Sequence, residues 1–484
     1  MTKRMTPSVF SLMVFLLAAT PVFARARDFR ELEKTVLDEL KETNTPGAAV
    51  AIVNGDRVVY AKGFGVSNIE TGAPVTPDML FVLASTTKVL TAVELVSLAE
   101  RRKIDLDKPI GNYVKGLGPR LSQITIHQLL DHTDGIVLMP DFDRFESFGD
   151  DDPARLASQV RAYKDNDYFF TEPGQIYSYS NLSFMLAGFI IEDLSGKAYW
   201  QVMDKDLFEP LGMSHSAFQP EMAMTFPLAQ GHAVDEKGKL AVNRPFYNEV
   251  SARPGGFVYS SAHDLARFAI AFMNDGRIDG KQVIAPSVIA DVSQPRVDVP
   301  FRYDVATMFF QDLKYGLGLF IKDHRGVHIV FHGGSDAAWG SLLIMAPKEK
   351  VAVIVLANKT SAMLGRTAEK AMELMLPLKP RPPGKRLQPT TMTLAEIRGY
   401  AGTYKNGFIE FVLFEKEGKL FRKIKQEPGQ AEFDAIVTKV GANRFTYVQP
   451  GQSTPTEFLL LPGPDGSSEY LCSGLIAAKK VEAK

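Results

Sequence analysis

The sequence predicts a two-part protein, an α+β domain followed by a small antiparallel β-barrel or sandwich. Three observations indicate this organisation. Strand-like runs stand at both ends of the first 375 residues, with helical stretches between them. A proline-rich, basic segment at 376–390 then breaks the apolar periodicity, as linkers do. Beyond it, at 391–484, short strand-like runs alternate with turn residues, which is the pattern of a small β domain.

The first domain is expected to span 28–375. Apolar residues at helical spacing over 29–40 predict an opening helix that ends at the sequence TNTPG. Strand-like runs AAVAIV and RVVYAKGFGV follow, and the turn signal Asn54-Gly55-Asp56 between them predicts a hairpin. The runs GVHIVFHGG and KVAVIVLAN come much later. We therefore expect one sheet whose two halves come together late in the chain.

The second domain shows four strand-like runs and no grouping of catalytic residue types. The runs are GFIEFVLFEKEGKLFRKI, FDAIVTKV, RFTYVQ and TEFLLLPG. Cys472 is the only cysteine of the chain, so it cannot form an internal disulfide. We interpret it as a core residue rather than a nucleophile, and we expect packing alone to stabilise the fold.

Composition and charge exclude several classes of partner. The 55 basic and 56 acidic side chains leave a formal net charge of -1, so no overall field attracts nucleic acid or an anionic membrane. With 45% hydrophobic and 23% charged residues, the chain can bury a sizeable core and reads as a soluble globular protein.

The N-terminus has the pattern of a secretory signal peptide. Lys3 and Arg4 precede an apolar run at 9–19 that is too short to span a bilayer. Small residues follow, with cleavage expected after Ala24 or Ala26. We predict a signal peptide at 1–26, a periplasmic or secreted mature protein, and no membrane span after cleavage.

The stretch FVLASTTKVLTAVELVSLAE places Ser85 one helical turn before Lys88, at the start of a helix that is apolar on most sides. A serine hydroxyl needs a base to become nucleophilic at neutral pH, and a buried lysine can serve because desolvation lowers its pKa. The pair therefore predicts a nucleophile and its base. The alternative is a helix cap with a lysine that extends to water.

Two further stretches contain polar side chains at the ends of elements. Tyr179-Ser180-Asn181 stands directly before an apolar helix, where a tyrosine could relay protons and an asparagine could bind a substrate carbonyl. Four residues end a strand-like run and could place a backbone N–H beside the nucleophile: His332, Gly333, Gly334 and Ser335. The alternatives are a core tyrosine with a helix cap, and a plain turn.

These three motifs in this order resemble the penicillin-recognising serine hydrolases. With Tyr-x-Asn as the second motif, the chain is closest to the class C β-lactamase branch and its esterase and D-peptidase relatives. The likeness covers roughly 35–375. It implies a β-lactamase/penicillin-binding-protein-like fold, with a central antiparallel sheet, helices on both faces and an all-helical lobe, followed by a lipocalin-like barrel.

The resemblance also implies roles for the candidate residues. Ser85 would attack the acyl carbon, and either Lys88 or Tyr179 would be the base. The backbone N–H groups of Ser85 and Ser335 would form the oxyanion hole, with Gly333 and Gly334 beside it. Asn181 would hold the substrate's amide or carbonyl group. No metal and no organic cofactor would be required.

One departure from the family changes the expected substrate. Class C β-lactamases carry Lys-Thr-Gly where this chain has His332-Gly333-Gly334, and a histidine is only partly charged near neutral pH. This favours a serine acyl-hydrolase that forms an acyl-enzyme on Ser85 and acts as an esterase or on D-amino-acid peptides. A class C-like β-lactamase, a D,D-carboxypeptidase and a non-catalytic penicillin-binding receptor remain alternatives.

Several features stay open at this level. The partner is expected to be a small ester, amide or peptide, whose identity would depend on loops such as 139–156. The role of the second domain and the oligomeric state cannot be deduced. His127, Asp131 and His132 lie close together in TIHQLLDHTDG but are interpreted as structural, and His324 and His328 as flanking a hairpin turn rather than as zinc ligands.

Overall fold

The computed structural model describes residues 28–138, 155–162, 168–244, 249–300, 312–381, 388–424, 432–449, 454–463 and 468–481. The predicted signal peptide at 1–26 lies outside these residues, so export stays a prediction. Most of the loop 139–156 and the centre of the predicted linker, 382–387, lie outside them as well. No helix in the described ranges is long and apolar enough to cross a membrane.

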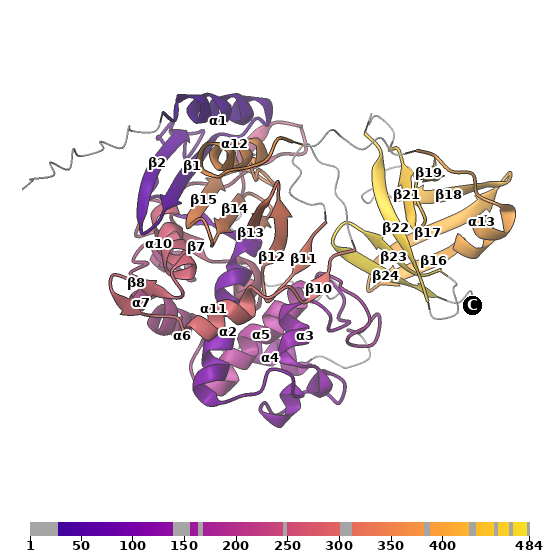
Figure 1. The fold of residues 1–484 in the computed structure, drawn as a ribbon, viewed down its shortest axis with the longest axis horizontal. Coiled ribbons are helices and arrows are strands. Elements are labelled where there is room, and N and C mark those ends of the chain that lie inside the picture. Colours follow the sequence, from indigo (N-terminus) through magenta and orange to yellow (C-terminus); the bar gives the residue numbers. More distant parts are fainter. Residues whose placement is uncertain are drawn as a thin grey trace, which may run out of the picture.

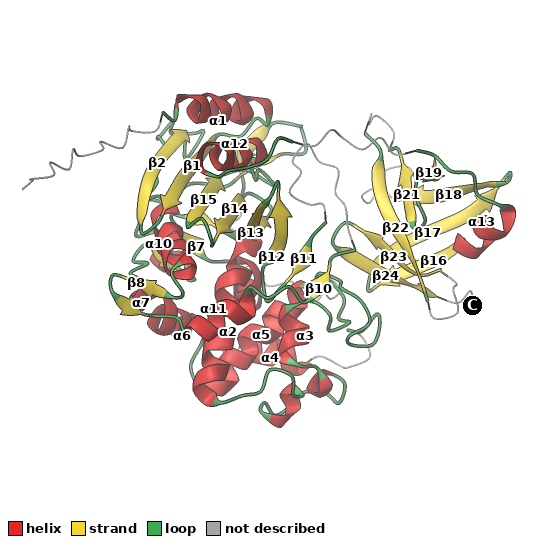
Figure 2. Cartoon of the chain, in the orientation of Figure 1, coloured by secondary structure: helices red, strands yellow, loops and turns green. Residues whose placement is uncertain are grey.

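An eight-stranded antiparallel sheet forms the centre of the first domain (Figures 1 and 2). In spatial order its strands are β10 (Val297–Asp298), β11 (Lys314–Tyr315), β12 (Phe320–His324), β13 (Val327–Ser335), β14 (Gly340–Ala346), β15 (Val351–Ala357), β1 (Gly47–Asn54) and β2 (Arg57–Gly65). Because β1 pairs with β15, the first and last strands of the domain are neighbours. The expected late joining of the two halves is confirmed.

Helices cover both faces of this sheet because its central strands are apolar on both sides. Along β1, Ala49, Ala51 and Val53 face one core cluster, and the intervening residues face the other. On one face lie α1 (Arg30–Glu42) and α12 (Gly365–Met375), which contact each other (Figure 1). On the other face α10 (Ala262–Met273) packs against β1 and β15.

A helical lobe adjoins the second face of the sheet (Figure 2). Its long helices are α2 (Thr87–Arg102) and α5 (Asn181–Ser195), which contact each other. The shorter helices of the domain are α3 (Ile126–Leu130), α4 (Arg155–Ala162), α6 (Tyr199–Val202), α7 (Glu209–Leu211), α8 (Pro220–Ala223), α9 (Arg253–Gly256), α11 (Pro286–Val292), η1 (Ala84–Thr86), η2 (Ile110–Asn112), η3 (Leu121–Gln123), η6 (Met203–Phe208) and η7 (Val250–Ala252).

Three small sheets complete the first domain. Their strands are β3 (Phe81–Val82), β7 (Tyr259–Ser260) and β4 (Ser216–Ala217) in the first, β5 (His232–Val234) and β6 (Leu240–Val242) in the second, and β8 (Arg277–Ile278) and β9 (Lys281–Gln282) in the third. The first of these sheets matters most for the site, because β3 leads directly into the turn that carries Ser85.

The C-terminal domain is a nearly closed antiparallel barrel rather than a sandwich. Its strands, in spatial order, are β19 (Phe433–Ile436), β18 (Lys419–Ile424), β17 (Ile409–Lys416), β16 (Gly402–Asn406), β24 (Ile476–Val481), β23 (Ser468–Ser473), β22 (Thr456–Pro462), β21 (Arg444–Tyr447) and β20 (Thr438–Lys439). The two edge strands, β19 and β20, are separated in sequence by Val437 alone, so the sheet curls back on itself.

The structure corrects the prediction in several details. The hairpin of β1 and β2 turns at Gly55-Asp56, because Asn54 still pairs with Arg57. The runs predicted in the barrel are strands, but β16, β23, β24 and the helix α13 (Leu394–Tyr400) were not predicted. His324 and His328 do flank a hairpin turn, as expected, since His324 pairs with Val327 across Arg325-Gly326.

The buried side chain of Asn358 stabilises the region of the main sheet where β1 pairs with β15. We expect its replacement to destabilise the fold. Asn358 accepts a hydrogen bond from the Gly47 N–H at 2.8 Å and donates to the carbonyls of Val66 and Ser67. Asn358→Ala removes a partner of the Gly47 N–H and of the Val66 carbonyl, while the Ser67 carbonyl keeps the Gln230 N–H, so the free energy of unfolding should fall by about 2–4 kcal/mol. Urea denaturation measures this. The exposed Asn112→Ala is the control, and equal effects of both changes would contradict the prediction.

Candidate active site

Ser85 lies in the short helix η1, at the junction of β3 and α2, and strand β13 holds this turn tightly. Ala84, directly before it, has φ 46°, a left-handed conformation that is unfavourable for alanine. The Ser341 hydroxyl donates to the Leu83 carbonyl at 2.5 Å, and the Thr86 hydroxyl donates to the His332 carbonyl at 3.3 Å. The strained turn is thus fixed from both sides, with Ser85 left partly exposed.

Lys88 lies directly beneath Ser85 and is fully buried. Its amine nitrogen, Nζ, is 3.3 Å from Ser85 Oγ, 2.8 Å from Asn181 Oδ1 and 2.7 Å from the Gly255 carbonyl oxygen. No carboxylate is among these three partners. The S-x-x-K spacing therefore does bring the hydroxyl and the amine together, and the lysine does not extend to water.

Burial lowers the pKa of Lys88 from 10.5 to about 7, because desolvation disfavours the charged ammonium. In its neutral form the amine has two hydrogens and one lone pair. The carbonyl oxygens of Asn181 and Gly255 can only accept, so they take the two hydrogens. The lone pair then points to the remaining neighbour, the Ser85 hydroxyl. This arrangement suits an amine that receives the proton of Ser85.

Tyr179 packs over the same amine. Lys88 Nζ lies 4.9 Å from the centre of the Tyr179 ring. The centre of the His132 ring lies 4.4 Å from the centre of the Tyr179 ring. Burial raises the pKa of Tyr179, and the nearby Ser85 side chain offsets this slightly. No standard hydrogen bond from its hydroxyl was found among the described residues. The Tyr179 hydroxyl is thus a neutral, buried group beside Ser85.

Asn181 is the first residue of α5, whose cap is Ser180. The Ser180 hydroxyl accepts from the Ser183 N–H at 3.3 Å and donates to the Val137 carbonyl. This cap fixes the start of α5, so Asn181 reaches Lys88 from a rigid element. The predicted contact of Asn181 with a substrate stays a prediction, but its position beside Ser85 and Lys88 is compatible with one.

The end of β13 passes close to the turn that carries Ser85. A Cβ on Gly334 would lie 2.1 Å from the Leu83 carbonyl oxygen and 3.1 Å from the Ala84 Cβ, so only glycine fits there. A Cβ on Gly333 would lie 2.8 Å from the Met363 sulfur. Ser335 follows at the exposed end of the strand, with its hydroxyl 2.7 Å from that of Ser361. The predicted approach of this strand to Ser85 is present.

His332 differs from the sequence expectation. Its ring is buried and its Nε2 lies 3.2 Å from the Tyr315 hydroxyl, inside the protein. Burial, together with the nearby Lys88, lowers its pKa to about 3. The expectation of a partly charged histidine near neutral pH is therefore wrong, because the imidazole is neutral in that range. Its side chain supports the site from within rather than facing a substrate.

The structure adds residues that the sequence did not identify. The Gly255 carbonyl binds the Lys88 amine, and the Ser341 hydroxyl, which bonds to the Leu83 carbonyl, lies 2.8 Å from the Thr86 hydroxyl. The stretch PGGFVYSSAHDLARF contains Gly255, but main-chain carbonyls leave no signature in a sequence. Tyr315 is a similar case, because its contact with His332 depends on β11 and β13 both pairing with β12.

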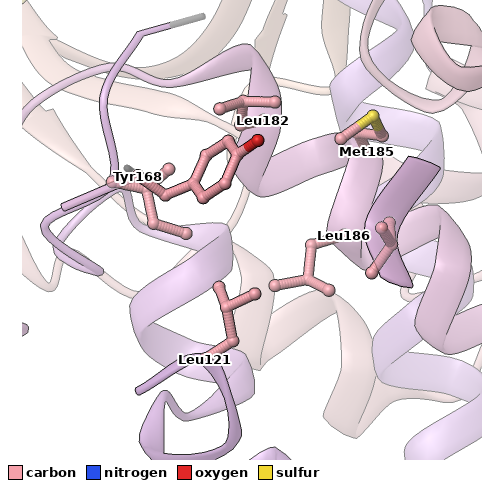
Figure 3. Close-up of a pocket in the computed structure, with 7 residues that line it drawn as sticks. Leu121, Tyr168, Leu182, Met185 and Leu186 are labelled. Carbon is pink, nitrogen blue, oxygen red and sulfur yellow. The ribbon is translucent and has the colours of Figure 1, made fainter. Parts of the chain in front are cut away.

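His132 and a cavity in the helical lobe are two further features of the described residues. His132 is buried, and its Nδ1 accepts from the Ser180 N–H at 3.2 Å. No cluster of three His, Cys, Asp or Glu side chains suited to a metal was found among the described residues. A cavity of about 10 Å³ in the helical lobe is lined by Leu121, Ile136, Val160, Tyr168, Leu182, Met185 and Leu186 (Figure 3). It is apolar and no larger than a water molecule, so it cannot hold a substrate.

Comparison with known proteins gives one family. The family model Beta-lactamase matches residues 29–374. Protein flp of Staphylococcus aureus strain N315 is 24% identical over 347 residues, which cover 70% of this chain and 65% of the relative. Unguisins hydrolase ungD' of Aspergillus campestris is 29% identical over 347 residues, 69% of this chain and 62% of the relative. The match thus spans slightly less than two thirds of the length of these relatives.

Solved structures share the fold over almost the whole chain. The crystal structure of SurE has a TM-score of 0.75 and 25% identity, and the alignment covers 93% of this chain and 98% of SurE. The octameric penicillin-binding protein homologue from Pyrococcus abyssi has a TM-score of 0.65 and 24% identity. That alignment covers 94% of this chain and 100% of the homologue. Both alignments therefore extend beyond the first domain into the barrel.

The low pKa of Lys88 predicts how the reactivity of Ser85 depends on pH. The base form of the amine is the minor form below pH 7 and dominates above it, so the rate of Ser85 labelling by a fluorophosphonate should rise about tenfold between pH 6 and pH 8. Stopped-time labelling followed by intact-protein mass spectrometry measures the rate, and Ser85→Ala is the unlabelled control. A rate that is flat over this range would contradict a base with a pKa near 7.

The close approach of β13 makes a second prediction. Gly334→Ala places a methyl group against the Leu83 carbonyl and must displace the Ser85 turn, so labelling of Ser85 should slow by at least about tenfold. Gly399→Ala is the matched control, because a Cβ there meets nothing within 4 Å. Equal labelling rates for the two variants would show that the turn tolerates the displacement.

Proposed function

The chain belongs to the Beta-lactamase family, and from this premise we propose that it is a serine hydrolase acting through an acyl-enzyme on Ser85. The observation that carries the proposal is the buried Lys88 amine, 3.3 Å from Ser85 Oγ and surrounded otherwise by carbonyl acceptors. A residue used only for structure would not need an amine in so costly a position.

The proposed reaction has two halves. Lys88 takes the proton of the Ser85 hydroxyl while Oγ attacks the carbonyl carbon of the substrate. The N–H groups of Ser85 and Ser335 bind the resulting oxyanion, and the leaving alcohol or amine takes the proton from the Lys88 ammonium when the bond to it breaks. Water then attacks the acyl-enzyme and gives up a proton to Lys88, directly or through Tyr179. This proton returns to Ser85 Oγ as the bond to the acyl group breaks, which releases the acid and the free Ser85 hydroxyl.

For the substrate we propose an ester or peptide that presents a D-amino acid. One relative is named as an unguisins hydrolase, and SurE has been solved with D-Leu. The neutral His332 supports this choice over a β-lactam or a D,D-carboxypeptidase substrate, because the resemblance places a cationic lysine there in class C β-lactamases to bind a carboxylate. A substrate whose reacting carbonyl carries no neighbouring free carboxylate does not need that charge.

Turnover of chromogenic substrates tests this proposal. The p-nitroanilides of D-leucine and L-leucine, p-nitrophenyl acetate and nitrocefin are compared with the wild-type chain and Ser85→Ala. We expect the acetate and the D-leucine anilide to be hydrolysed, nitrocefin to be turned over slowly, and Ser85→Ala to lose at least about a thousandfold in kcat/KM.

Three results would contradict parts of the proposal. Unchanged turnover by Ser85→Ala would exclude it as the nucleophile. Equal rates for the two leucine anilides would remove the preference for a D-residue. Stoichiometric labelling of Ser85 by all substrates, without turnover, would favour a penicillin-binding receptor over an enzyme.

A further inference from the structure

Two hairpin turns at one end of the barrel lie against the loop that carries Tyr179. Strands β16 and β17 turn at Gly407-Phe408, and β23 and β24 turn at Gly474-Leu475. Because β16 pairs with β24, both turns are at the same end of the barrel, which faces the first domain (Figure 1). The fit is close, since a Cβ on Gly407 would lie 3.2 Å from the Val137 Cβ.

Asn406 is the centre of the polar contact between the two domains. Its Oδ1 accepts from the Leu138 N–H at 3.1 Å, and its Nδ2 donates to Ser178 Oγ at 3.2 Å and to the Ala477 carbonyl at 2.6 Å. The Ala477 N–H donates to the same Ser178 hydroxyl at 3.2 Å. Asn406 and Ser178 are both 1% exposed. Because these hydrogen bonds are buried, they hold the barrel hairpins and the loop of the first domain in one relative position.

The backbone of Tyr179 is held by the second hairpin. Its N–H donates to the Leu475 carbonyl at 2.9 Å. The N–H groups on either side, of Ser178 and Ser180, bond instead to the His132 carbonyl and the His132 ring. The loop thus runs extended between the His132 turn and the barrel, bound alternately to each. The Leu475 side chain also packs against the apolar cluster that contains Tyr179.

We propose that the barrel hairpins position Tyr179 for catalysis and that Asn406 is the positioning residue. This inference rests on the proposed function, in which Tyr179 lies beside the reacting Ser85. Asn406 touches neither the nucleophile nor the amine, so it acts through Ser178 and the loop. The second domain is then a part of the active-site framework, since it supplies a hydrogen-bond partner to the backbone of Tyr179 itself.

The position of Tyr179 leaves little tolerance for movement. Its ring contacts both the Lys88 amine and the His132 ring, and its hydroxyl is buried near Ser85. A catalytic group displaced by about 1 Å can lose about a hundredfold in rate. Loss of the Asn406 network should therefore lower kcat, while leaving KM nearly unchanged, because Asn406 itself is not among the residues proposed to contact the substrate.

A double-mutant cycle in the full-length chain tests the inference with p-nitrophenyl acetate. We expect Asn406→Ala to lower kcat about tenfold, with KM within about twofold of the wild type. In a Tyr179→Phe background, which lacks the hydroxyl to be positioned, the same change should lower kcat by less than about twofold. Asn443→Ala, at an exposed asparagine of the same barrel, is the control and should leave kcat unchanged.

The outcomes separate positioning from general support of the fold. An equal loss of kcat from Asn406→Ala in both backgrounds, or no loss in either, would overturn the inference. If Asn406→Ala does not fold, Ser178→Ala removes the acceptor of the same network and enters the cycle in its place. Ser85→Ala is run alongside. If Ser85→Ala retains turnover, the proposed function is overturned. If Ser85→Ala loses turnover while Asn406→Ala remains fully active, only the positioning role of Asn406 is overturned.

Discussion

The burial of one lysine amine beneath a strained serine turn is the constraint around which the first domain is organised. Lys88 has three polar neighbours, and each comes from a different element: η1, α5 and α9. All three can be present only if η1, α5 and α9 meet at one point. The two acceptor carbonyls also select the direction of the amine's lone pair. Packing thus directs the lone pair toward the Ser85 hydroxyl.

The same burial is unfavourable for stability. In the unfolded chain Lys88 has a pKa near 10.5, whereas in the folded protein the value is about 7. The folded state therefore binds fewer protons between these values, so the contribution of Lys88 to stability becomes more favourable as pH rises from about 7 to 10.5. At neutral pH the cost is on the order of 4 kcal/mol. Such a cost is expected at a functional site and is offset by the large apolar core around it.

The sequence predicted the parts of the site that depend on local spacing and missed those that depend on tertiary contacts. Ser85 and Lys88 could be paired because three residues make one helical turn, and the glycines of β13 because a close backbone approach excludes a side chain. The neutrality of His332 could not be predicted, because it follows from burial beside Lys88. The Gly255 carbonyl was equally hidden, since a main-chain acceptor constrains no residue type.

The contact between the barrel and the first domain also combines a feature that a sequence can indicate with one that it cannot. The Leu475 contact to Tyr179 uses a backbone carbonyl, so almost any residue at 475 could make it and no pattern reveals it. Asn406 is different, because asparagine is disfavoured in strands and costly to bury without partners. A buried asparagine at the end of β16 is therefore a readable sign of a polar contact outside the barrel. Asn406 is itself the first residue of the Asn-Gly pair Asn406-Gly407, which a local reading assigns to the hairpin turn alone. Only the tertiary structure shows that this asparagine side chain bonds to Leu138 and Ser178 of the first domain and to Ala477.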